Sequence, residues 1–367
     1  MTRLLAFSIR PLVIAVAIAG AVRCQTLPEL AVRGLDPVAL CNGEEVPGAE
    51  DRTIDLRRYR YRFASDANRA TFEADPERWC IQLGGGCGRM GPLSGVGDPE
   101  RFAVHDGRIY IFASDGCRTG FLKDPARFME TADPAVEGDD DAHAAANELL
   151  DRAVDAIGGA ERLKALRSVA MRDEREQEHE GRKVKTGSSL LLAAPGRIRS
   201  ESWWDAYHVA LVSSGRAGFV AERRGADGER TVWDFDGSQA LLHAKNALRE
   251  PIALLAARGR DGYVAVAKGE REVGDRKARD VAISFFGVTT TLWIDVEDGR
   301  VLGASYHGRL GPSANAEVEL RFDDFRDVDG FVLPFVRRAS IGGKDAGTRT
   351  WTSVVVNGEL DRALFRR

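Results

Sequence analysis

The residues best suited to chemistry in this chain are thiols, and all of them lie in its first third. The sequence of 367 residues has five cysteines, and four of these follow the N-terminal segment: Cys41, Cys80, Cys87 and Cys117. Two of the four sit in the glycine-rich stretch 79–94, WCIQLGGGCGRMGPLS. A loop of this composition can cradle a phosphate, hold a metal ion or be closed by a disulfide.

The phosphate alternative fails on sequence context. Residues 86–91 match the pattern GxGxxG, but Pro92 follows at once and no strand–loop–helix pattern surrounds the glycines. The segment also lacks the Gly-Lys-Ser/Thr of a P-loop. We therefore set phosphate binding aside.

The metal alternative rests on soft ligands, because thiolates and thioethers select Cu(I) or Zn. Cys87 and Met90 are three residues apart in the loop, and Cys117 falls in the first turn of a helix that Ser114 would cap. The dipole of such a helix favours the thiolate that binds metal. His105, expected at a hairpin turn, offers an imidazole. The predicted site is therefore Cys87, Cys117, Met90 and His105, with copper or zinc as cofactor.

The disulfide alternative stays open beside the metal site. Four cysteines allow three pairings, and the sequence does not choose among them. The pairing of Cys80 with Cys87 and of Cys41 with Cys117 is one of the three. In an exported domain each bridge would add about 2–4 kcal/mol to the free energy of unfolding.

The N-terminus predicts export. Arg3 and Arg10 precede or open an apolar run that ends near Val22, and small residues at 19–21 suit a cleavage site, so residues 1–21 are interpreted as a signal peptide. The run is too short to favour a membrane span. Cys24 is a candidate for lipidation and hence for a lipid anchor, although Arg23 occupies a position where a lipobox needs a small residue. We expect a periplasmic or cell-envelope location.

An internal repeat organises the first third of the chain. The segment 61–79, YRFASDANRATFEADPERW, aligns without gaps with 110–128, YIFASDGCRTGFLKDPARF, and ten of the nineteen positions are identical. Each copy predicts a strand, a serine that caps a short helix, a buried phenylalanine on that helix, and an Asp-Pro that starts a turn.

This region resembles the YHS domain family over about residues 28–130. The resemblance is carried by LDPVAL (35–40), the two YxFAS units, the two DPxR units and the GGGCG loop (84–88). Small YHS domains and the related metal-sensing TRASH modules carry a cysteine three residues after the serine, and Cys117 occupies that position. The second ligand position of the family holds Ala113 here. The resemblance implies a YHS-like domain at 27–130 and favours the metal alternative.

The remainder of the chain is predicted to form a second domain. An acidic stretch at 131–146 is expected to be a linker, and apolar residues at helical spacing follow it. From about residue 168 alternating strands and Asp-Gly or Pro-Gly turns indicate an antiparallel meander. We therefore predict an α+β protein in which the YHS-like module precedes this domain at 147–367.

The later strands resemble the LolA/LolB-like lipoprotein-carrier fold. The likeness lies in the succession and spacing of turns and strands, as in PGRIRSE (195–201), WDFDG (233–237) and LWIDVEDGRVLG (292–303). That fold is a curved antiparallel half-barrel round a helix, with an apolar cavity. The resemblance implies an apolar-ligand cavity, and its candidate lining residues are tryptophans: Trp203, Trp204, Trp233, Trp293 and Trp351.

Composition and motifs narrow the function to binding. The net charge of −4 argues against a nucleic-acid partner. No histidine sits in HExxH, no GxSxG elbow is present, and no nucleophile is marked with its base, so we predict no catalytic residue. The expected protein is exported and non-enzymatic, and it handles a soft metal through the thiol-rich module. The alternative is a carrier of a lipid, a lipoprotein or another apolar ligand in which the cysteines form only structural disulfides.

Overall fold

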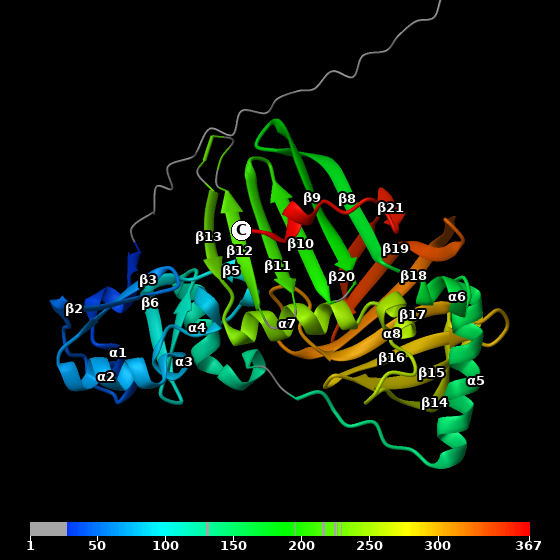
Figure 1. Cartoon of the computed structure of the whole chain (residues 1–367), viewed down its shortest axis with the longest axis horizontal. Helices are drawn as coiled ribbons and strands as arrows, with labels where there is room; N and C mark the ends of the chain where they lie inside the picture. Colours follow the sequence, from blue (N-terminus) through cyan, green and yellow to red (C-terminus); the bar gives the residue numbers. More distant parts are fainter. Residues whose placement is uncertain are drawn as a thin grey trace, which may run out of the picture.

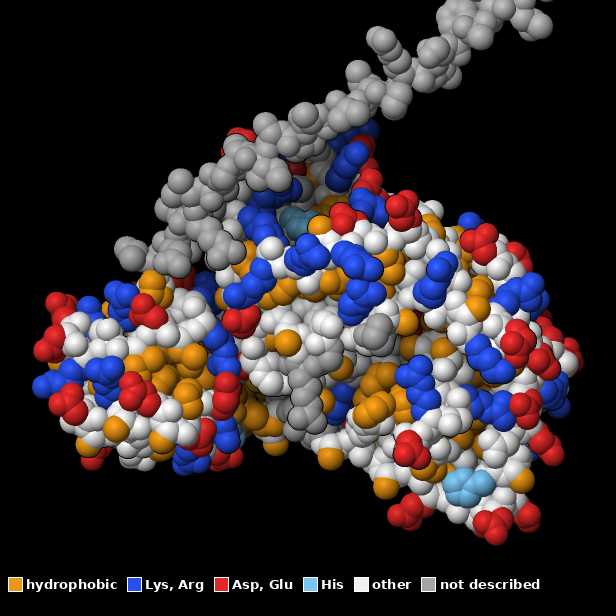
Figure 2. Space-filling model, in the orientation of Figure 1, with side chains coloured by type: hydrophobic (Ala, Val, Ile, Leu, Met, Phe, Trp, Pro, Cys, Tyr) orange, Lys and Arg blue, Asp and Glu red, His pale blue; other side chains and the backbone are white. Residues whose placement is uncertain are grey.

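The structure is a computed structural model that describes residues 28–129, 132–194, 196–214, 217–223, 225, 227–228 and 230–367. The predicted signal peptide and Cys24 lie outside the described residues. A small N-terminal module stands beside two larger antiparallel sheets (Figure 1). Side chains of both charges are interspersed over the face in view (Figure 2). No helix in the described part of the chain has the length and apolar character needed to cross a membrane.

The N-terminal module consists of two successive halves. The first contains β1 (Glu29–Leu30), η1 (Ala31–Gly34), α1 (Pro37–Cys41), β2 (Ala49–Leu56), β3 (Tyr59–Phe63), α2 (Asp66–Ala74) and α3 (Pro76–Trp79). The second contains η2 (Leu83–Gly85), β4 (Gly86–Cys87), β5 (Gly91–Val96), β6 (Asp98–His105), β7 (Arg108–Phe112), α4 (Asp115–Lys123) and η3 (Pro125–Phe128). The halves form sheets of order β1-β3-β2 and β5-β4-β7-β6.

The predicted repeat is confirmed in three dimensions. In each half a strand leads into a helix whose first turn is capped by serine. The Ser65 hydroxyl accepts the Asn68 N–H at 3.1 Å, and the Ser114 hydroxyl accepts the Cys117 N–H at 3.2 Å. The phenylalanine of each helix is fully buried. Capping and burial thus fix both helices on their sheets in the same way.

The repeat is longer than the sequence alignment indicates. Each half also contains a turn of three residues in the left-handed region, with φ of 41°, 58° and 78° for residues 32–34 and of 58°, 58° and 84° for residues 83–85. The last carbonyl of each turn accepts a backbone N–H at 2.9 Å, from Gly48 in the first half and from Gly97 in the second. The module is therefore a duplicated unit over most of its length.

Two seven-stranded sheets make up most of the rest of the chain. The first has the order β13-β12-β11-β10-β9-β8-β21 and the second has the order β14-β15-β16-β17-β18-β19-β20. The strands of the first sheet are β8 (Ser168–His179), β9 (Arg182–Ala193), β10 (Arg197–Trp204), β11 (Tyr207–Ser214), β12 (Ala217–Arg223), β13 (Arg230–Asp234) and β21 (Ser353–Val356). Those of the second are β14 (Val264–Val273), β15 (Arg276–Phe285), β16 (Val288–Asp295), β17 (Val301–Gly308), β18 (Ala316–Val328), β19 (Phe331–Ile341) and β20 (Lys344–Thr350).

Helices fill the space between and beside these sheets (Figure 1). They are α5 (Asp140–Ile157), α6 (Ala160–Lys164), α7 (Gly237–Leu248), α8 (Pro251–Ala256) and the terminal η4 (Arg362–Phe365). One core cluster joins the apolar stripe of α5 to α8 and to the second sheet. Leu150 and Leu254 are fully buried in it. The interior is thus a packed core, which is the physical source of most of the fold's stability.

The predicted single curved half-barrel is instead a pair of open sheets. The change of sheet occurs where β20 leads into β21. The Trp351 N–H donates to the Phe335 carbonyl on β19, and the Thr352 N–H donates to the Arg172 carbonyl on β8, both at 2.8 Å. Because successive residues pair with different sheets, the strands turn a corner at this point instead of continuing one curved surface.

The predicted acidic linker at 131–146 is also corrected in part. Helix α5 already begins at Asp140, and the Asp133 side chain is only 4% exposed. Its carboxylate accepts from Lys245 Nζ at 3.1 Å, from Arg249 Nη2 at 3.0 Å and from the Thr289 N–H at 2.8 Å. The composition suggested a solvated connection, but this one buried carboxylate pairs with two buried cations, Lys245 on α7 and Arg249 at the C-cap of that helix.

Replacing Asp133 with alanine should strongly destabilise the C-terminal sheets. We expect Asp133→Ala to lower the free energy of unfolding by about 3–5 kcal/mol, because Lys245 and Arg249 are buried and would each lose an ion pair with this carboxylate. Urea denaturation measures this loss. Glu137→Ala, on the exposed part of the same stretch, is the matched control and should change the free energy by less than about 0.5 kcal/mol. Equal effects of the two substitutions would contradict the anchoring role of Asp133.

Candidate functional site

A polar cavity of about 160 Å³ lies between the two large sheets. The first sheet contributes serines on β9 and β10, among them Ser188, Ser200 and Ser202. The second contributes Arg337, Arg349 and Trp351, and Glu250 closes one side at the start of α8; Ser189, Leu190 and Glu201 complete the wall. Ligand pockets for drug-sized molecules measure about 300–1,000 Å³, so this cavity suits a smaller polar group.

Arg337 reaches the cavity because of its register on β19. Phe331, Leu333 and Phe335 occupy alternate positions on the core side of that strand, and Arg337 continues the series. Its guanidinium donates twice to Glu250, at 2.9 and 2.5 Å. The Nε atom of Arg337 is buried without a hydrogen-bond partner. One donor of this guanidinium is therefore unused.

Trp351 lies between two guanidinium groups. The centre of its ring is 5.9 Å from Arg337 and 5.3 Å from Arg349. Arg349 Nε is 3.0 Å from Asp173 Oδ2, yet burial and, to a smaller extent, the nearby Arg337 lower the pKa of Arg349. The two cations thus share Trp351 as a neighbour, and each already pairs with a carboxylate: Arg337 with Glu250 and Arg349 with Asp173.

His243 on α7 supports the serine wall. Its Nε2 is 2.9 Å from the Ser200 hydroxyl and its Nδ1 is 2.9 Å from the Ser213 hydroxyl. Burial lowers the pKa of His243 to about 4. The imidazole is therefore neutral at pH 7 and a weak base, so we assign it to holding α7 against β10 and β11.

The tryptophans do not converge on one apolar cavity, contrary to the prediction. Three of them are covered by arginine guanidinium groups at 4.1–5.0 Å from the ring centre: Trp203 by Arg172, Trp233 by Arg58 and Trp293 by Arg271. Trp204 is 44% exposed. Only Trp351 of the predicted set lines the polar cavity. The apolar depression beside α5 measures only about 30 Å³, because helix side chains occupy the interior.

All four described cysteines are free thiols, and they fall into two groups. Cys41 and Cys80 share one core cluster of the module, whereas Cys87 and Cys117 share another. The pairing named in the sequence analysis, Cys80 with Cys87 and Cys41 with Cys117, would therefore have to join residues from different clusters. Burial raises the pKa of both Cys41 and Cys80 to about 11, so these two thiols stay protonated at neutral pH.

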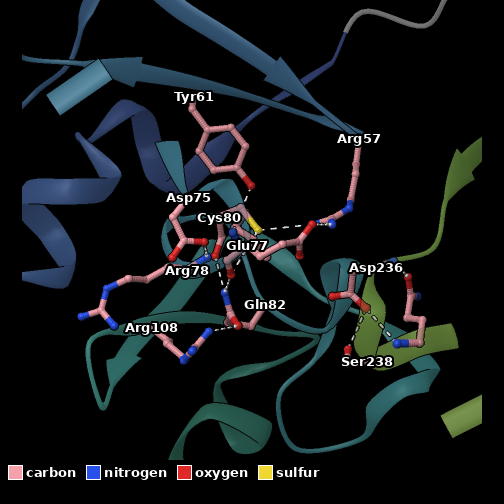
Figure 3. Close-up of polar contacts among 12 residues, drawn as sticks. Arg57, Tyr61, Asp75, Glu77, Arg78, Cys80, Gln82, Arg108, Asp236 and Ser238 are labelled. Carbon is pink, nitrogen blue, oxygen red and sulfur yellow. Dashed lines mark hydrogen bonds and ion pairs between the residues drawn. The ribbon is translucent and has the colours of Figure 1, made fainter. Parts of the chain in front are cut away.

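Cys80 lies at the junction between the module and α7 (Figure 3). Arg57 Nη1 donates to Cys80 Sγ at 3.3 Å and its other terminal nitrogen contacts Glu77. Asp236, the N-cap of α7, adds a favourable charge for the same guanidinium. Arg57 thus lies between the Cys80 thiol of the module and the negative charge at the start of α7.

The predicted metal ligands are brought together only in part. Cys87, Cys117 and Met90 pack in one cluster, in which Cys87 is fully buried. The ring of His105 packs edge-on against Phe121, with ring centres 5.9 Å apart. Over the described ranges no group of three or more His, Cys, Asp or Glu residues is placed to hold a metal ion. Copper or zinc binding remains a prediction.

Sequence reasoning missed Arg337, Arg349 and the serine wall. A signal for Arg337 was present, because a charged residue continues an alternating series of apolar ones along 331–341. The serines on β9 and β10 gave no comparable signal. Their convergence with the arginines depends on the corner between the two sheets.

The neutral state of His243 predicts a specific acid sensitivity. The folded-state pKa of about 4 lies below the ordinary 6.5, so the unfolded chain binds the proton first as pH falls. The contribution of His243 to the free energy of unfolding should be fully present above pH 6.5. It should fall by about 3 kcal/mol between pH 6.5 and pH 4. We expect His243→Gln to show a shallower pH dependence of unfolding over this range, whereas exposed His307→Gln should follow the wild type. Parallel curves for all three proteins would contradict the assignment.

Comparison with known proteins gives weak structural likenesses. No family model matches the sequence, and no curated protein matches it. A DUF1329 family protein from Desulfovibrio piger is 13% identical, covering 60% of this chain and 96% of its own, with a TM-score of 0.39. A putative outer membrane lipoprotein-sorting protein domain from Vibrio parahaemolyticus is 10% identical, with coverages of 59% and 97% and a TM-score of 0.35. A LolA superfamily protein from Nitrosomonas europaea is 12% identical, with coverages of 60% and 96% and a TM-score of 0.33. At TM-scores this low, these likenesses do not support any inference about function.

Proposed function

We propose that this chain is an exported, non-enzymatic carrier of an amphiphilic molecule with an anionic head group. The observation that carries the proposal is the polar cavity of about 160 Å³ between the sheets. The size of the cavity suits a head group, and its two guanidinium groups, although paired with Glu250 and Asp173, offer charged donors to an anion. This proposal follows the carrier alternative of the sequence analysis.

The wall of the cavity is suited to an amphiphile because it is polar on one side and apolar on the other. Serine hydroxyls and guanidinium groups supply donors for phosphate, sulfate or carboxylate oxygens. Leu190 and Trp351 belong to the packed core and form the apolar side. An acyl chain would have to enter beside them by displacing core side chains, since the apolar depression near α5 is water-sized.

Soft-metal handling by the module is the other function expected from the sequence, and it remains a separate prediction. The cluster of Cys87, Cys117 and Met90 offers two thiols and a thioether. A structural zinc site would need four ligands. The carrier proposal does not depend on this cluster.

The carrier proposal predicts selective binding of anionic amphiphiles. We expect dodecyl phosphate, kept below its micelle concentration, to bind the full mature chain in calorimetric titration. Dodecyltrimethylammonium should bind at least tenfold more weakly. Arg349→Gln should weaken dodecyl phosphate binding by about 10- to 100-fold, because a charge-assisted hydrogen bond is worth about 1.5–3 kcal/mol.

The matched control is Arg338→Gln. Arg338 follows the cavity residue Arg337 on β19, but its side chain is paired with Asp323 on the exposed side of the sheet. Its replacement should leave the affinity unchanged. Equal binding of both amphiphiles, or binding that appears only with loss of the near-ultraviolet dichroism, would overturn the proposal.

A further inference from the structure

The duplication of the module places Cys87 where the first half has a buried carboxylate. The left-handed turns end at Gly34 and Gly85, and in each half the second residue after the turn is a buried acceptor: Asp36 in the first half and Cys87 in the second. Both residues are 0% exposed. The two halves therefore share one backbone frame around two different acceptors.

The donors around the two acceptors correspond one by one. Asp36 accepts from the N–H groups two and three residues ahead, Val38 and Ala39, at 2.9 and 3.1 Å. It also accepts from the Ala64 N–H at 2.7 Å, and from Asn68 Nδ2 at 2.9 Å. These four hydrogen bonds fully satisfy a buried charge.

Cys87 has the same surroundings in the second half. Its sulfur accepts from the Ala113 N–H at 3.4 Å, and Ala113 aligns with Ala64. The N–H groups of Arg89 and Met90, again two and three residues ahead, also point at the sulfur. The residue that aligns with Asn68 is Cys117, which packs in the same cluster as Cys87. The second half thus replaces a hydrogen-bonded Asp–Asn pair with a pair of thiols.

From this correspondence we infer that Cys87 and Cys117 form a reversible dithiol–disulfide pair. The two thiols pack in one cluster, and a disulfide needs no ligand beyond two sulfurs, whereas a metal site would need further ligands. Cys117 is partly exposed and lies in the first turn of the nine-residue helix α4. Cys87 is buried behind it. Disulfide exchange begins at an accessible thiol, and Cys117 is the more accessible of the two.

The reaction class is thiol–disulfide exchange with a small disulfide such as glutathione disulfide. The Cys117 thiolate attacks one sulfur of the oxidant, and the first glutathione leaves as its thiolate. The Cys87 thiol loses its proton and attacks the Cys117 sulfur, so that the Cys87–Cys117 bond forms and the second glutathione leaves. Two electrons pass to the oxidant, and the two protons from the protein thiols end on the two glutathione thiols.

The test is disulfide mapping of the full mature chain. The protein is reduced, freed of metal with a chelator, equilibrated with glutathione disulfide, alkylated and digested with trypsin. We expect a peptide covering 79–89 linked to one covering 109–118, and a return to free thiols with excess reduced glutathione. Because 79–89 holds both Cys80 and Cys87, the same experiment on Cys80→Ala assigns the bond to Cys87. If Cys117 stays alkylatable throughout, or links to Cys41 or Cys80, the inference is wrong.

A transplanted pair provides a second test that does not depend on thiol chemistry. Cys87→Asp combined with Cys117→Asn recreates the pair seen at Asp36 and Asn68. We expect this double variant to fold with a melting temperature within a few degrees of the reduced wild type and to be unaffected by glutathione disulfide. Oxidation of the wild type should raise its melting temperature by several degrees. Cys41→Ala is the matched control and should keep the oxidation response. A double variant that does not fold would show that the two halves are not equivalent.

Discussion

The arrangement of the C-terminal sheets depends on the pairing of charges that are buried between them. Asp133 accepts from Lys245 on α7 and from Arg249 at the C-cap of that helix, and Glu250 at the start of α8 accepts twice from Arg337 on β19. An unpaired charge in such a place would cost several kcal/mol. The pairs therefore fix where α7 and α8 lie relative to the second sheet, and this position in turn determines which side chains face the polar cavity.

The need to satisfy buried polar groups also explains how one backbone frame in the module can hold two different acceptors, a carboxylate and a thiol. In the first half a carboxylate fits a pocket of N–H donors and is permanently satisfied. In the second half a thiol occupies the corresponding pocket, where burial raises the pKa of Cys87 and the surrounding N–H groups lower it. The frame has been kept while the acceptor has changed from a group that only anchors to one that can also react. A purely structural role would be served equally well by the carboxylate.

Local sequence patterns predicted much of the fold but little of the cavity. The strand–cap–helix repeat at 61–79 and 110–128 was correct because serine caps and buried phenylalanines act over a few residues. The meander after residue 168 was also correct, for the same reason. The half-barrel was wrong because its curvature depends on the partner change at Trp351 and Thr352, and backbone pairing of this kind leaves no local signature. The role of Asp133 was missed because acidic composition alone does not distinguish a solvated carboxylate from a buried one.

The loop at 83–92 gives the module a physical connection to the proposed carrier cavity. The Pro92 carbonyl accepts from Gln239 Nε2 at 3.0 Å, and a side chain in place of Gly84 would overlap the Gln239 amide. Gln239 closes the capping box of α7, the helix that carries His243 against Ser200 at the cavity wall. The Arg89 carbonyl accepts from Arg309 Nη2 at 2.6 Å next to β17. Because Cys87 lies inside this loop, a change in its bonding acts on the segment through which the module contacts α7 and Arg309.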